Sequence, residues 1–174
     1  GGPAVDRLVP VPGRDDVVLG VGSDLSLLDI TGEDVTVVEK VDKEPGQWFK
    51  DAAVDADGSH VVAASPNSSL HFPRYQVDTL EPSGETFSDP TGTPEGASAS
   101  GAHGGIWAAS TSLYDRVHVF ADGVPTPLAD FEPEGRPGNG RLVLATDGSA
   151  AYLASGSAEG VRFEVLPLSP TIAS

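Results

Sequence analysis

The sequence predicts an all-β fold, a β-propeller of four-stranded blades with about four blades in this chain, on three observations. A turn followed by a short apolar run occurs four times at a nearly fixed spacing, and a second strand pattern follows each run. No segment shows a helical periodicity longer than about one turn. A repeat of about 40 to 45 residues with four strands is typical of a propeller blade.

The apolar run sets the length of the repeat. It reads "VVLGVGS", "VVAASPN", "IWAASTS" and "AYLASGS", and it begins at Val17, Val61, Ile106 and Ala151, every 44 or 45 residues. Turn signals such as "DADGSH" and "TDGSA" precede it, because Gly accepts a positive φ at little steric cost. Each unit is therefore expected to begin with a tight hairpin.

Three more strands complete each predicted unit. The strand after the run reads "DLSLLDI", "HFPRYQVD", "DRVHVFAD" or "EGVRFEVLPL", and the alternation of Val117 and Val119 with His118 is typical of a half-buried strand. A third strand follows, as in "DVTVVEKV", and an inner strand such as "GASASGA" precedes the turn, where small residues suit a crowded axis. We expect one domain with blades at about residues 4–41, 47–91, 95–132 and 139–174, the last outer strand being "PTIAS" (170–174).

A β-sandwich is the alternative fold, because it also combines short strands with frequent turns. The even repeat favours the propeller. Four blades form either a closed ring or part of a larger one. The chain contains no Met, so we expect a processed or excised piece, and we favour an incomplete portion of a larger propeller.

The repeated hairpins carry a family resemblance. The stretches "VDADGSHVVAAS" (54–65), "GGIWAAS" (104–110) and "LATDGSAAYLAS" (144–155) resemble the first hairpin of blades in NHL, YVTN and gluconolactonase-like propellers. The resemblance covers nearly the whole chain, and it implies a fold that many functions share. Such propellers usually have six to eight blades, so four blades depart from the family pattern.

Composition limits the partners. The net charge is −16, with 26 acidic and 10 basic residues, which disfavours binding to nucleic acid or to anionic membranes. No apolar stretch reaches the roughly 20 residues of a membrane helix, so no membrane insertion is expected. The absence of Cys excludes disulfides and thiolate metal sites.

The resemblance implies that the loops entering the inner strands and those after the second strand gather on one side of the ring. The candidate ligand-binding residues on that side are Trp48, Lys50, Asp51, Asn67, His71, Tyr114, Asp115, Arg116, Glu134, Arg136 and Asn139. An exposed Trp or Tyr near Arg suits a binding hot spot. Trp48 has a second interpretation, that it fills a gap between blades, and Trp107 is expected in the core.

Signals for chemistry are sparse. The histidines His60, His71, His103 and His118 are not at metal-ligand spacing, and no metal site or cofactor is predicted, with Ca²⁺ the one open alternative. Asp55 and Asp57 before Gly58 resemble the start of a calcium loop, but turn chemistry explains them better. No G-x-S-x-G motif is present, and Asn67-Ser68-Ser69 is a glycosylation sequon.

We therefore predict a non-enzymatic, extracytoplasmic β-propeller that serves as a binding or scaffold domain. It would recognise a protein or other ligand, or associate with itself, through its loop side, at the cell surface or outside the cell. One alternative is a hydrolase or lactonase that uses a divalent metal at the axis. Another is a structural subunit of a surface assembly.

Overall fold

Four separate antiparallel sheets make up the described part of this protein. The computed structural model describes residues 4–66, 72–87, 94–99, 106–111, 116–121, 124, 126–134, 141–145, 149–157 and 160–168. Every regular element among these residues is a β-strand. The all-β prediction is therefore confirmed.

Each sheet is a meander whose strands pair in chain order. Blade 1 contains β1 (Val5–Pro10), β2 (Val17–Gly22), β3 (Leu25–Asp29) and β4 (Thr36–Lys40). Blade 2 contains β5 (Asp51–Val54), β6 (His60–Ala64), β7 (Phe72–Gln76) and β8 (Pro82–Phe87). Consecutive strands can pair in this way because short turns join them.

The last two sheets repeat this order. Blade 3 contains β9 (Pro94–Ala99), β10 (Ile106–Thr111), β11 (Arg116–Ala121) and β12 (Ala129–Phe131). Blade 4 contains β13 (Arg141–Leu144), β14 (Ala150–Ser157) and β15 (Gly160–Pro167). The predicted outer strand at residues 170–174 lies outside the described residues. The single-domain assignment and its blade limits stay a prediction.

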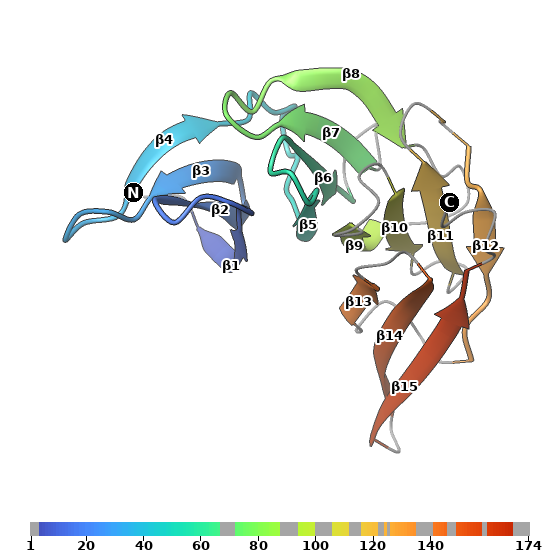
Figure 1. The fold of residues 1–174 in the computed structure, drawn as a ribbon. Coiled ribbons are helices and arrows are strands. Elements are labelled where there is room, and N and C mark those ends of the chain that lie inside the picture. Colours follow the sequence, from blue (N-terminus) through green and yellow to red (C-terminus); the bar gives the residue numbers. More distant parts are fainter. Residues whose placement is uncertain are drawn as a thin grey trace.

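The four sheets lie side by side in chain order along an open arc (Figure 1). Strands β1, β5, β9 and β13 line the inside of the arc, and β5 contacts β1 and β9, while β9 also contacts β13. This radial order is that of propeller blades, and the alternative of two stacked sheets in a sandwich is wrong.

Apolar side chains fill the space between neighbouring blades. Between blades 1 and 2 the cluster includes Leu19, Leu25, Phe49 and Val61. Between blades 2 and 3 it is Ala53, Val62, Ala64, Phe72, Trp107 and Phe120. Between blades 3 and 4 it includes Val117, Val119, Leu142 and Leu153. Every inner sheet is thus apolar on both faces, as expected for a sheet that is covered on both sides.

Trp107 confirms its predicted place in the core. It is fully buried between blades 2 and 3, and the guanidinium of Arg74 lies 5.9 Å from the centre of its ring. At this distance the cation is attracted to the face of the indole. His60 and His118 lie on β6 and β11, as predicted.

The "DADGSH" motif forms the hairpin between β5 and β6. One carboxylate oxygen of Asp55 accepts a hydrogen bond from the His60 amide at 3.1 Å, and the other accepts one from the Ser59 hydroxyl at 3.0 Å. Asp57 accepts a bond from the Ser59 amide at 2.9 Å. Gly58 has a φ of 75°, a left-handed conformation that favours glycine. The motif therefore stabilises the turn through its own backbone, in agreement with turn chemistry.

Candidate functional site

The strand order determines which loops share a side of the ring. In a meander of four strands, the link between the second and third strands lies on the same side as the link that crosses to the next blade. We call this the crossover side. It carries the β2–β3 and β4–β5 links, and the latter, residues 41–50, is called the crossover segment.

Backbone hydrogen bonds fix the crossover segment to both blades that it joins. The Val41 amide donates to the Leu25 carbonyl at 3.0 Å, and the Phe49 amide donates to the Gly22 carbonyl at 2.8 Å. The next amide, of Lys50, donates to Ala64 of blade 2 at 2.9 Å. A loop with its backbone bonds satisfied at both ends holds its side chains in a defined place.

A polar network inside the loop adds to this order. The Gln47 side-chain amide donates to the Ser65 hydroxyl at 3.1 Å, and that hydroxyl donates to the Trp48 carbonyl, also at 3.1 Å. The Glu44 amide donates to the Gln47 side-chain oxygen at 3.0 Å. Gln47 and Ser65 are buried, and satisfied buried hydrogen bonds of this kind make a loop rigid.

Phe49, and not Trp48, fills the gap between blades 1 and 2. Phe49 is fully buried in the cluster between these blades, and its ring meets that of Tyr75 edge-on with a centroid distance of 6.3 Å. Burial raises the pKa of Tyr75 above its ordinary value. Trp48 is half-buried and Lys50 is exposed, so the two residues that flank Phe49 face away from this core.

All three lysines of the chain lie at positions 40 to 50, in or next to the crossover segment. The buried carboxylate of Asp24 pairs with Lys40 at 2.8 Å and with Lys43 at 2.6 Å. Burial alone would raise the pKa of Asp24, but the hydrogen bonds and charges of both lysines outweigh it and lower the pKa. Burial also lowers the pKa of Lys50, in the direction of a neutral amine.

Asp51 follows the crossover segment at the start of β5. Its carboxylate is buried and forms an ion pair with Arg7 on β1, and it also accepts a hydrogen bond from the Ala52 amide at 2.9 Å. The pair joins the inner strands of blades 1 and 2. This contact makes Asp51 part of the scaffold under Trp48 and Lys50.

The remaining described candidates lie in other blades. Arg116, at the start of β11, forms an ion pair with Asp130 of the same blade at 2.6 Å. Glu134 forms an ion pair with Arg162, and its amide donates to Glu164 of blade 4 at 2.8 Å. The structure thus brings Trp48, Lys50 and Asp51 together but not Arg116 or Glu134. The candidates that lie outside the described residues are Asn67, His71, Tyr114, Asp115, Arg136 and Asn139.

Sequence reasoning missed Arg7, Asp24 and Gln47. One signal was available for Arg7, because Arg7 and Asp51 are 44 residues apart, one repeat, and carry opposite charges. Residues one repeat apart lie on neighbouring inner strands, so such a pair is a candidate contact. No comparable pattern marks the buried carboxylate of Asp24.

Within the part of the chain that the structure describes, no group of three or more His, Asp or Glu side chains could hold a metal ion. His118 is buried, with its Nδ1 3.6 Å from Asp130, and His60 Nδ1 is 3.3 Å from Asp55. These are pairs within one blade. The same described residues contain no helix long and apolar enough to cross a bilayer.

Comparison with known proteins establishes the fold and no family. No protein-family model matches the sequence. No curated protein matches it either. The groups named from the hairpin motif therefore stay a resemblance.

The structure resembles 476 chains of solved structures, so this fold alone points to no single function. One of them comes from a crystal structure of a nidogen/laminin complex, with a TM-score of 0.64 and 16% sequence identity. The alignment covers 86% of this chain and 56% of the other, so this chain spans about half the length of its neighbour. At this identity the match shows what the fold is, an arrangement of β-propeller blades.

Proposed function

We propose that this chain is a non-enzymatic β-propeller domain that binds a protein partner through its crossover side. The observation that carries the proposal is the pair of Trp48 and Lys50 on a loop that is bonded to two blades. Trp48 presents aromatic surface that is half-buried before any partner arrives, and so little conformational freedom is lost on binding.

The chemistry of this loop suits a contact between proteins. Trp is among the residues that contribute most to protein interfaces, because its large ring combines apolar area with one hydrogen-bond donor. Lys50 is exposed beside it and could meet a carboxylate or a backbone carbonyl of the partner. The net charge of −16 favours a partner that is basic overall, and such a pair would associate faster at low salt.

The fold neighbour agrees with this proposal without establishing it. Its structure is that of a complex between two proteins, by its title nidogen and laminin. An extracellular or cell-surface location is a further part of our proposal, and it rests on the same likeness of fold.

The test is affinity capture on the immobilised chain, with the Trp48→Ala variant beside it. Ile30→Ala is the matched control, since Ile30 is an exposed apolar residue on the opposite side, in the β3–β4 turn. Proteins from a secreted fraction that the wild type and the control retain, and that the Trp48 variant loses, would be purified and their Kd measured. We expect the variant to bind at least ~10-fold more weakly, as for an interface hot spot.

Two outcomes would contradict the proposal. The first is a partner whose Kd is the same for the wild type and for Trp48→Ala, provided that circular dichroism shows both to be folded. The second is a purified partner that the Ile30 variant loses instead, since this would move the site to the opposite side of the ring.

A further inference from the structure

The two ends of the arc expose sheet faces of a kind that is buried everywhere else in the molecule. Blade 1 packs on blade 2 through one face and blade 4 packs on blade 3 through one face, which leaves one free face at each end. We call the free face of blade 1 the first end face and that of blade 4 the last end face. Both border the opening of the arc in Figure 1.

The last end face is apolar across all three described strands. Val143 pairs with Tyr152, and Tyr152 pairs with Val165, so these side chains form a row across the sheet. Phe163 and Val161 continue the same face along β15. Phe163 is 79% exposed, Val161 69% and Val165 62%. A sheet with one face in water would carry polar residues here.

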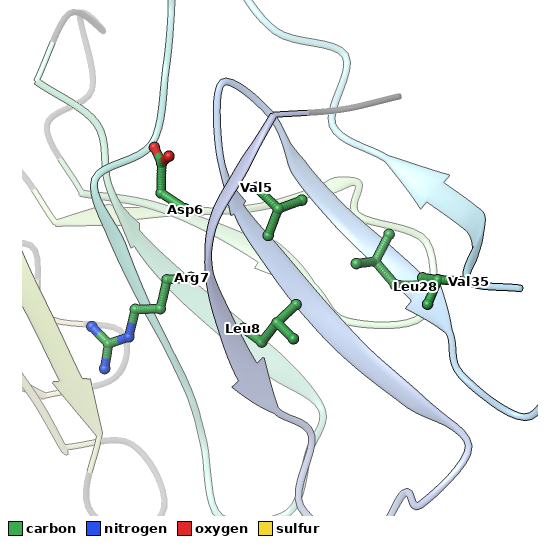
Figure 2. Close-up of a pocket in the computed structure, with 6 residues that line it drawn as sticks. All are labelled: Val5, Asp6, Arg7, Leu8, Leu28 and Val35. Atoms are coloured by element: carbon green, nitrogen blue, oxygen red, sulfur yellow. The ribbon is translucent and has the colours of Figure 1, made fainter. Parts of the chain in front are cut away.

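The first end face is apolar and hollowed. An open depression of about 350 Å³ is lined by Val5, Asp6, Arg7, Leu8, Leu28 and Val35. Figure 2 shows Val5, Leu8, Leu28 and Val35 around the same space, whereas Asp6 and Arg7 point to the other side. Leu8 is 59% exposed and Val35 63%.

A glycine helps to keep this hollow open. Gly20 lies on β2 opposite Leu8 and Ser26, and a Cβ at Gly20 would come within 2.9 Å of Leu28 Cδ1 and 3.1 Å of Val5 Cγ2. The face therefore has room for side chains from another sheet. The last end face has the opposite shape, because its exposed aromatic rings are its largest side chains.

We propose that the two end faces bind each other between two copies of this chain. The last end face of each copy packs on the first end face of the other, and the reciprocal contact closes a twofold ring. The packing continues the pattern inside the chain, where the forward face of each blade meets the backward face of the next. A single chain supplies both faces, so a second copy covers both ends at once.

The charge of the chain predicts how this association depends on salt. Two copies that each carry −16 repel, and salt screens this repulsion while leaving apolar contact intact or stronger. The dimer should therefore strengthen with added salt. The partner contact proposed at the crossover side should weaken instead, so the failure of one proposal can be told from the failure of the other.

The experiment measures mass in solution by light scattering and sedimentation, over a wide range of concentration and at low and high salt. We expect a species of twice 17.8 kDa whose share rises with concentration and salt. Leu8→Lys and Phe163→Lys should each shift the dimer Kd by at least ~10-fold, as for a hot spot. Leu128→Lys is the matched control, because Leu128 is an exposed apolar residue of blade 3 outside both end faces.

Mixing the two variants tests which faces meet. Leu8→Lys keeps an intact last end face and Phe163→Lys keeps an intact first end face, so their mixture should recover a dimer that neither forms alone. A Leu8→Lys dimer as tight as that of the wild type would overturn the proposal, because it would mean that two last end faces bind each other. A folded monomer at all concentrations, or open-ended polymers, would overturn it too.

Discussion

Replacing Gly58 with Ala should disturb the contact between the first hairpins of blades 1 and 2. Gly58 has a φ of 75°, and a Cβ built on it would lie 2.6 Å from the carbonyl oxygen of Pro12. That oxygen belongs to the backbone of the β1–β2 hairpin, so it cannot move by a simple side-chain rotation. The substitution must shift one hairpin relative to the other.

Gly13 provides a matched control within the same structure. It also has a φ of 75°, in the β1–β2 turn, but a Cβ there would meet nothing within 4 Å. Gly13→Ala should therefore cost only the left-handed strain, about 1–2 kcal/mol. Gly58→Ala adds the steric clash, of about 1–3 kcal/mol if it behaves like overpacking in a core. The expected total for Gly58 is about 2–5 kcal/mol.

The assay is urea unfolding followed by far-ultraviolet circular dichroism, with midpoint and slope fitted for the wild type and both variants. A lower midpoint at constant slope reports lost stability, and a changed slope would report a change in compactness. Equal losses for the two variants would refute the reasoning, since the clash with Pro12 would then contribute nothing. A larger loss for Gly13→Ala would refute it more strongly.

Two further results are expected from the lysine-rich region. Asp24→Asn should lower the free energy of unfolding near neutral pH by about 1–3 kcal/mol, through lost charge-assisted hydrogen bonds to Lys40 and Lys43. Because folding lowers the pKa of Asp24, this stabilisation is present above the carboxyl's unfolded pKa and is lost as the pH falls through the folded one. Urea unfolding at neutral and acidic pH checks both points, and an unchanged difference in acid would contradict the second. Burial lowers the pKa of Lys50, so its amine should acylate faster than Lys40 or Lys43 in a mass-spectrometric time course, and equal rates at all three would contradict this.

The repeat was readable from the sequence because turn chemistry and strand spacing are local properties. The predicted run at Val61 begins one residue after the start of β6, and the run at Ile106 begins β10. The direction of each side chain was not readable in the same way. Val62 and Trp107 are one repeat apart, yet Val62 faces blade 3 while Trp107 faces blade 2.

The physical reason is that the inner blades are buried on both faces. When both faces are apolar, the alternation of polar and apolar residues that assigns a strand to one side is weak, and a shift by one residue leaves no trace. The same holds for the site. Trp48 stands out by residue type, but its exposure depends on Phe49 occupying the space between the blades, and no sequence pattern separates these adjacent aromatics.

The chain-order packing of the blades affects how stability is distributed. Within the described residues each apolar cluster joins only two consecutive blades, so the molecule behaves as a short stack with nearest-neighbour coupling instead of one shared core. Blades 2 and 3 are held from two sides, while blades 1 and 4 are held from one. Local opening should then start at the ends of the stack, and amide protons of β6 and β10 should exchange more slowly than those of β2 and β14.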